Sequence, residues 1–263
     1  MKEHGDRETI LITGASRGIG EAIARELASN EVELVLVARS EDALETLCEE
    51  LRGEGFTASL MRVDLCDPKE RVAFIEEFRR THGARLKGVV LSAGVAHAGD
   101  FLSQPIEQIH HEMCLNYEAP LEFIRALLPD LLDKPDAFLV AISSLTSLIP
   151  FPGHTSYAAS KGALTALMRS LAAEYADRAV HIGVLLPGYT DTVMTENLES
   201  MMPAMAPEEV ARALRESIDK REPMHIPGMS NKLANLTFQL FPTLSHQALS
   251  QLGEYLIPSE HAS

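Results

Sequence analysis

The stretch ILITGASRGIGEAIARELA, residues 10–28, joins a short apolar run to an amphipathic one through a glycine-rich turn. The run ILIT has the apolar, β-branched composition of a buried strand. After the turn, Ile19, Ile23 and Leu27 recur every four residues, which is the spacing of one helix face. A strand that leads directly into a helix begins a β–α–β unit, so this stretch indicates an α/β protein.

Six further apolar runs follow along the chain, ending at residues 38, 63, 92, 143, 186 and 226. Longer amphipathic patterns separate them, and this alternation is typical of parallel strands covered by helices on both faces. We therefore expect a doubly wound parallel sheet of the Rossmann type with about seven strands. In this architecture ligands bind at the carboxyl ends of the strands. The chain has no internal repeat or low-complexity linker, so residues 1–263 are expected to form a single domain.

The composition excludes several function classes. Acidic residues outnumber basic residues by 38 to 23, giving a formal charge of −15, which disfavours nucleic acid and anionic membranes as partners. The chain shows no secretory signal and no apolar run of the roughly 18 residues that a membrane span needs. Cys48, Cys66 and Cys114 lack metal-ligand spacing, so we expect reduced, buried cysteines in a cytoplasmic protein and no metal site.

The turn after the first predicted strand carries Gly14, Gly18 and Gly20 in the spacing G-x-x-x-G-x-G. Glycines here permit a tight turn and close backbone approach to a pyrophosphate, and the following helix N-terminus offers N–H donors to the phosphates. Glycine-rich turns also occur for steric reasons alone. The position between a strand and a helix nevertheless favours a dinucleotide site.

The end of the second predicted strand indicates which dinucleotide is bound. NAD sites usually carry Asp or Glu there to hold the ribose 2′-hydroxyl. This chain has Ala38 at that place, followed by Arg39, and Arg17 stands inside the glycine turn. Two guanidiniums suit the 2′-phosphate of NADP(H), because arginine makes charge-assisted bonds to phosphate. The alternative is that both are ordinary surface arginines.

The stretch TSYAASKGAL, residues 155–164, places Tyr157 and Lys161 one helical turn apart on one face. A nearby ammonium is expected to lower the pKa of the phenol below its usual value of about 10, which suits general acid–base catalysis. Ser144 directly follows the strand that ends at residue 143, so its hydroxyl lies where substrates bind. Its neighbour Ser143 is an alternative that spacing does not exclude.

In this order and spacing, the motifs resemble those of the short-chain dehydrogenase/reductase family over residues 8–230. The matching segments are TGASRGIG (13–20), VDL (63–65), LNYEAP (115–120), SSLTSLIPFPGHTSYAASK (143–161) and PGYTDT (187–192). The resemblance selects Ser144 over Ser143. It implies four catalytic residues, Asn116, Ser144, Tyr157 and Lys161. It implies cofactor contacts at Gly14, Ser16, Arg17, Gly18, Ile19, Gly20, Arg39, Asp64, Leu65, Ala93, Gly94, Tyr157, Lys161, Pro187, Gly188, Thr190 and Thr192.

One position departs from the family pattern. The family usually has Asn-Ala-Gly after its fourth strand, where this chain has Ser92, Ala93 and Gly94. The asparagine side chain ties neighbouring strand ends together, and serine is shorter. We expect slightly lower local stability with catalysis retained.

In the family, the region of residues 193–206 forms a lid over the substrate. Here it carries Met194, Met201, Met202 and Met205, and an adaptable methionine surface suits a hydrophobic substrate. These methionines could equally face the protein core. His97 and His154 are expected to be solvent-exposed loop residues near the mouth of the cleft.

The C-terminal tail, residues 229–263, has the pattern of two short amphipathic helices separated by Pro242. Packing against a second subunit is the favoured interpretation; covering the substrate pocket and touching a membrane are the alternatives. Family members often form dimers or tetramers through the regions here numbered 105–130 and 156–176. We therefore expect a homodimer or a homotetramer.

The sequence thus predicts an NADP(H)-dependent oxidoreductase that interconverts a small-molecule ketone or aldehyde, expected to be hydrophobic, and its alcohol. One alternative is a catalytically idle NADP(H) sensor, although it would have no use for the four catalytic residues. A nucleotide-sugar epimerase or dehydratase shares the Tyr157 and Lys161 spacing. Such enzymes usually carry a larger C-terminal domain than the residues after Ile226 can form.

Overall fold

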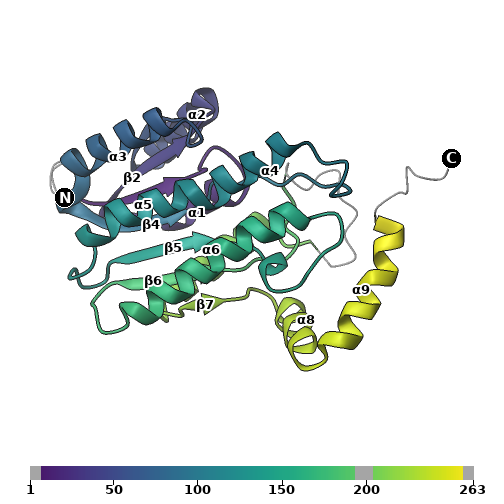
Figure 1. Ribbon diagram of the computed structural model, residues 1–263. Coiled ribbons are helices and arrows are strands. Elements are labelled where there is room, and N and C mark those ends of the chain that lie inside the picture. Colours follow the sequence, from purple (N-terminus) through teal and green to yellow (C-terminus); the bar gives the residue numbers. More distant parts are fainter. Residues whose placement is uncertain (1–6, 193–203, 257–263) are drawn as a thin grey trace.

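The computed structural model describes residues 7–192 and 204–256. Its centre is a parallel sheet of seven strands in the order β3-β2-β1-β4-β5-β6-β7 (Figure 1). The strands are β1 (Glu8–Thr13), β2 (Val32–Ala38), β3 (Thr57–Arg62), β4 (Leu86–Leu91), β5 (Phe138–Ile142), β6 (His181–Leu185) and β7 (Met224–His225). Each coincides with one of the apolar runs of the sequence, so the predicted doubly wound sheet is confirmed.

Helices cover both faces of the sheet and create two hydrophobic cores. One core contains α1 (Gly18–Leu27), α2 (Glu41–Gly53) and α7 (Pro207–Asp219). The other contains α3 (Pro68–His82), α5 (Ala119–Leu127) and α6 (Thr155–Glu174), with α4 (Ile106–Met113) alongside. Side chains of β1 alternate between the two cores, with Leu11 in one and Ile10 and Ile12 in the other. The buried two-sided strand explains why the apolar runs are nearly continuous.

The strand order reverses between β1 and β4, so the crevice of the fold lies at their carboxyl ends. Thr13 joins these ends, because its hydroxyl accepts the backbone N–H groups of Ser92 and Ala93 at 3.1 and 3.3 Å. The link between neighbouring strand ends is therefore provided from β1 and does not depend on the side chain of Ser92.

The two predicted tail helices are present as α8 (Met229–Leu240) and α9 (Pro242–Leu256), which lie beyond the end of the sheet (Figure 1). Pro242 is the first residue of α9, a position where its missing N–H costs no helical bond. The helix α8 buries Asn231 and Asn235 against the protein. Its apolar residues instead face outward: Leu233, Leu236 and Leu240 are 62%, 51% and 61% exposed.

The expected lid, residues 193–206, lies mostly outside the described residues, as do Met194, Met201 and Met202. Where the chain is described again, the N–H of Met205 donates to the carbonyl of Tyr189 and its carbonyl accepts from Asp191, both at 2.9 Å. Among the residues described, no helix is long and apolar enough to cross a membrane, and no group of three metal-binding side chains occurs.

Candidate active site

The glycine turn between β1 and α1 leaves no room for side chains. Gly14 and Gly18 have positive φ angles of 70° and 60°, which favour glycine. A Cβ atom on Gly14 would lie 2.6 Å from the Cα of Ala93, and one on Gly20 would lie 2.1 Å from the carbonyl oxygen of Gly14. The backbone thus turns tightly into the N-terminus of α1 beside the β4 end, an arrangement that fits a pyrophosphate.

The two arginines predicted to select the cofactor flank this turn. Arg17 is the N-cap residue of α1, and Arg39 follows β2 directly. Both side chains are exposed, and neither has a hydrogen-bond or ion-pair partner among the described residues. Two guanidiniums without a carboxylate partner remain available for an anion.

The turn after β3 carries Asp64 and Leu65. The Asp64 carboxylate accepts the N–H of Cys66 at 2.9 Å, and Glu70 accepts the N–H of Asp64 at 2.8 Å. The carbonyl of Leu65 accepts a bond from the buried Arg71 at 2.5 Å. These bonds fix the turn where the resemblance predicts the adenine.

The segment Pro187 to Thr192 forms the remaining side of the predicted cofactor site, after β6. A Cβ atom on Gly18 would lie 3.3 Å from Cγ2 of Thr192, so this segment meets the start of α1. At its other end, Gly188 lies against the Asn231 side chain of α8, since a Cβ atom on Gly188 would lie 2.4 Å from Oδ1 of Asn231. Predicted cofactor residues of the loops after β1, β4 and β6 therefore lie against one another.

Asn116 lies in a π-helical turn, Cys114–Glu118, between α4 and α5. Such turns are frequent at functional sites. Its side chain is fully buried and bonds both backbone groups of Val95, each at 2.9 Å, and the hydroxyl of Ser160, also at 2.9 Å. The amide thereby connects the loop after β4 to α6.

The two serines after β5 face different neighbours. The hydroxyl of Ser143 bonds the carbonyl of Lys161 at 3.1 Å and the hydroxyl of Thr165 at 2.6 Å, so it fastens β5 to α6. The hydroxyl of Ser144 accepts from Thr146 and interacts with the phenol of Tyr157. The geometry therefore favours Ser144 as the serine of the candidate site.

Lys161 is buried in α6 and Tyr157, one helical turn earlier, is partly buried, but the pKa of the phenol differs from the expectation. Burial raises the pKa of Tyr157 to about 12; the Ser144 hydroxyl opposes this rise and the charge of Glu112 adds to it. Burial lowers the pKa of Lys161 to about 8, and its ammonium donates to the carbonyl of Ile142 at 2.9 Å. The predicted acidification of Tyr157 is therefore wrong, because loss of water around the phenol outweighs an ammonium that is directed to a backbone carbonyl.

Gly94 brings the polar groups of the site together. A Cβ atom there would lie 3.1 Å from Oδ1 of Asn116 and 3.2 Å from Nζ of Lys161. The four side chains Asn116, Ser144, Tyr157 and Lys161 thus gather at the carboxyl end of the central strands, as the sequence predicts for a catalytic group.

Glu112, which no sequence motif indicated, is fully buried in α4. Its Oε1 accepts the backbone N–H of His97 at 2.6 Å and lies 3.3 Å from Nδ1 of the same residue. Its Oε2 has no partner among the described residues. The sequence signal that could have identified Glu112 is its spacing: it precedes Asn116 by four residues, which is about one helical turn.

The expectation that His97 and His154 are exposed loop residues is wrong. His97 is held against Glu112, and its side chain is 25% exposed. The ring of His154 lies 6.3 Å from that of Tyr157, and its Nδ1 is buried without a partner among the described residues. The His154 ring therefore lies near Tyr157, whereas the His97 ring lies against α4.

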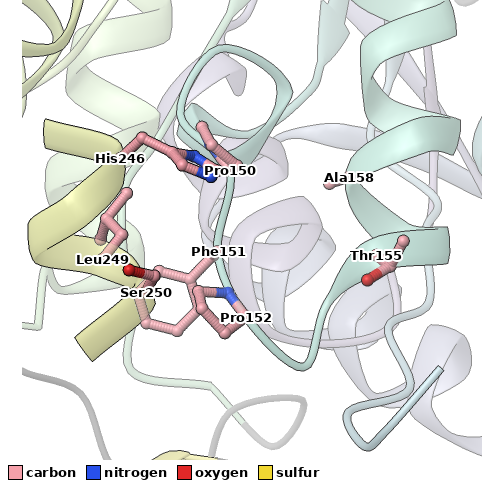
Figure 2. A pocket seen from close by; sticks show the side chains of 8 residues that line it. All are labelled: Pro150, Phe151, Pro152, Thr155, Ala158, His246, Leu249 and Ser250. Atoms are coloured by element: carbon pink, nitrogen blue, oxygen red, sulfur yellow. The ribbon is translucent and has the colours of Figure 1, made fainter. Parts of the chain in front are cut away.

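A cavity of about 320 Å³ lies between α9 and the loop that leads into α6. In Figure 2, His246, Leu249 and Ser250 of α9 face Pro150, Phe151 and Pro152, and Thr155 and Ala158 of α6 lie across the opening. The lining is mostly apolar, and Ala158 is the immediate neighbour of Tyr157. The tail helix α9 therefore borders an apolar cavity beside the candidate site.

A family model described as short chain dehydrogenase matches residues 8–203 of this chain. The chain belongs to the short-chain dehydrogenase/reductase family. The family is one of nicotinamide-dependent oxidoreductases, and the glycine turn and crevice described above fit such a cofactor.

Similar proteins cover nearly all of this short-chain dehydrogenase/reductase. Oxidoreductase UcpA of Salmonella typhimurium is 33% identical over 232 residues, which are 87% of this chain and 88% of UcpA. A short-chain dehydrogenase from Sphingobium yanoikuyae, solved with NADPH, has a TM-score of 0.78 and 27% identity over 97% of this chain and 98% of its own. The bulky-bulky ketone specific alcohol dehydrogenase of Comamonas testosteroni has a TM-score of 0.75 and 26% identity over 98% of both chains.

Proposed function

We propose that this protein is an NADP(H)-dependent oxidoreductase that interconverts a hydrophobic ketone or aldehyde and the corresponding alcohol. The observation that carries the proposal is the contact of the Tyr157 phenol with the Ser144 hydroxyl, one helical turn before the buried Lys161. Burial raises the pKa of this phenol to about 12. At neutral pH the phenol is therefore protonated, which is the form that donates a proton to a carbonyl oxygen during reduction.

The neighbouring residues have complementary roles in this proposal. Ser144 holds the substrate oxygen against the phenol by a hydrogen bond. The Lys161 ammonium, buried next to Asn116 and Gly94, provides a positive charge that favours the phenolate left after proton transfer. Asn116 fixes the loop after β4 and connects to Ser160 on α6, which keeps these groups in register. The bound nicotinamide supplies or accepts the hydride.

NADP(H) is proposed over NAD(H) because of charge at the end of β2. Ala38 occupies the place where an acidic side chain would hold a ribose 2′-hydroxyl, and Arg17 and Arg39 flank the crevice without a carboxylate partner among the described residues. The similar protein from Sphingobium yanoikuyae, solved with NADPH, is consistent with this choice.

A hydrophobic substrate is supported by the apolar cavity between α9 and residues 150–152, next to Tyr157 along α6. The similar Comamonas testosteroni enzyme is described as specific for bulky-bulky ketones, which is consistent with a large apolar substrate. We also propose that residues 1–263 form one domain; the expected lid, residues 193–206, lies mostly outside the described residues.

We also propose a cytoplasmic homodimer or homotetramer. The three cysteines are free thiols, which suits a reducing compartment. The exposed Leu233, Leu236 and Leu240 give α8 an apolar face that a second subunit would cover. Sedimentation of the purified protein tests this: a monomer at micromolar concentration would contradict it.

The reaction is tested by mixing the protein with NADPH and a panel of hydrophobic ketones and aldehydes while NADPH absorbance is followed. Tyr157→Phe removes the proton donor and keeps the ring, so turnover should fall by roughly 100-fold or more while NADPH binding stays. Turnover that survives in this variant would contradict the assignment of Tyr157. NADPH binding without turnover of any carbonyl compound would instead favour a sensor.

A further inference from the structure

Two cysteines that are distant in the sequence meet beside the predicted adenine site. Cys66 lies in the turn after β3, directly after Asp64 and Leu65, and Cys114 begins the π-helical turn that contains Asn116. The thiol of Cys114 lies 3.8 Å from the carbonyl oxygen of Cys66, and the two thiols also interact with each other. The expected burial of the cysteines is wrong for these two: both are partly exposed, so small oxidants can reach them.

The two sulfurs have different surroundings. The guanidinium of Arg71, itself only 3% exposed and paired with Glu122, places Nη1 4.0 Å from the sulfur of Cys114. Burial raises the pKa of Cys66 to about 12, with the neighbouring Cys114 adding to the effect. Because a guanidinium N–H lies against the sulfur of Cys114 and burial keeps Cys66 as a thiol, we assign Cys114 as the attacking cysteine and Cys66 as the resolving one.

We propose that Cys66 and Cys114 form a reversible disulfide when the protein meets hydrogen peroxide, and that this bond weakens NADP(H) binding. The Cys114 thiolate attacks one peroxide oxygen, giving a sulfenic acid and releasing hydroxide as the O–O bond breaks. The Cys66 sulfur then attacks the sulfenic sulfur, forming the S–S bond and releasing the oxygen and the thiol proton as water. Peroxide is thereby reduced by two electrons, and the two thiols are oxidised.

The disulfide is expected to weaken NADP(H) binding because it forms beside the turn that carries the predicted adenine contacts. A disulfide requires a sulfur separation of about 2.05 Å, which is shorter than any contact between separate thiols. Closing it pulls the turn of Asp64 to Cys66 toward the π-helical turn and strains the bond between Asp64 and the N–H of Cys66. That turn carries the predicted adenine contacts. The proposal rests on the proposed nucleotide site but not on the proposed reaction.

The disulfide is tested by peptide mass spectrometry on the full chain after brief exposure to peroxide, alkylation and digestion with trypsin. Cys66, Cys114 and Cys48 fall in the separate peptides 63–69, 88–125 and 40–52. We expect peptides 63–69 and 88–125 to be joined, and dithiothreitol to release them. Cys48 is fully buried in α2 and serves as the internal control, which should remain an unlinked thiol. Absence of the joined peptide would overturn the proposal.

The effect on binding is measured by titration with NADPH, followed by its own fluorescence and without any carbonyl substrate. Oxidised wild-type protein should bind NADPH about tenfold more weakly than reduced protein, and dithiothreitol should restore the affinity. Cys66→Ser and Cys114→Ser should not respond to peroxide, whereas Cys48→Ser should respond like the wild type. Equal affinity of the oxidised and reduced forms would overturn the proposal. Because no turnover is measured, a failure of the proposed reaction would not change either readout.

Discussion

Glu112 and Asn116 lie one helical turn apart and hold the same loop, the segment that follows β4. Asn116 bonds both backbone groups of Val95 at 2.9 Å, and Glu112 accepts the N–H of His97 at 2.6 Å. The loop beside Tyr157 is therefore anchored at two successive points.

Two substitutions of Glu112 should distinguish the effect of its hydrogen bond from the effect of its charge. Glu112→Leu leaves the buried N–H of His97 without an acceptor and should lower the free energy of unfolding by about 1–3 kcal/mol. Glu112→Gln retains an acceptor for this N–H and should lower the free energy of unfolding by a smaller amount. Burial lowers the pKa of His154 and the charge of Glu112 opposes this, so Glu112→Gln should lower the His154 pKa further, as measured by NMR titration. An unchanged His154 titration in that variant would show that the charge does not act there.

Deprotonation of the Lys161 ammonium should lower the rate of carbonyl reduction at alkaline pH. Burial lowers its pKa to about 8, so the positive charge is present below that pH and lost above it. We expect kcat/KM for carbonyl reduction to be constant at lower pH and to fall as pH rises through about 8. Lys161→Met should abolish this step. Lys134→Met is the matched control, since Lys134 bonds carbonyls at the amino end of β4, away from the site, and should leave the profile unchanged.

His181 should make the fold sensitive to acid. Burial, with the charge of Arg221, lowers its pKa from 6.5 to about 4. As pH falls below 6.5, His181 becomes protonated in the unfolded chain but stays neutral in the folded protein. The free energy of unfolding therefore decreases. Between pH 7 and pH 5 the free energy of unfolding should fall by about 1–2 kcal/mol from this residue alone. In His181→Gln, which does not titrate, urea denaturation should show a correspondingly smaller loss over the same range.

Gly20 should be irreplaceable for cofactor binding. A Cβ atom there would lie 2.1 Å from the carbonyl oxygen of Gly14, so Gly20→Ala must displace the turn. We expect NADPH affinity to fall by at least tenfold, a difference of about 1.4 kcal/mol, in a fluorescence titration. Gly162→Ala is the control, because a Cβ atom at that helical position meets nothing within 4 Å. It should fold at least as well as the wild type, since alanine favours helix over glycine by about 1 kcal/mol.

Arg39 should decide between the two dinucleotides. Arg39→Asp removes a cation and places a carboxylate after β2, where NAD sites carry one. The ratio of NADPH to NADH affinity should fall by at least tenfold, mainly through weaker NADPH binding. Arg212→Asp changes the same charge on the exposed side of α7 and should leave the ratio unaltered. If both variants shifted the ratio equally, net charge rather than the Arg39 site would be responsible.

The sequence by itself determined the fold and the members of the candidate site. Strands buried on both faces must be apolar throughout, so all seven runs were visible without coordinates. The glycine turn and the pairing of Tyr157 with Lys161 were likewise visible, because they depend on fixed distances along one turn or helix, whereas the resemblance to the family supplied Asn116 and selected Ser144 over Ser143. Local spacing is preserved in the folded protein, and the sequence records it directly.

Only the tertiary structure decided how these groups behave. The separate partners of Ser143 and Ser144, the contact of Glu112 with His97 and the meeting of Cys66 with Cys114 all join segments that are remote in the chain. The direction of the Tyr157 pKa also depended on how far the fold removes the phenol from water, which spacing to Lys161 does not reveal. Burial and long-range contacts arise when helices close over the sheet, so no stretch of sequence contains them.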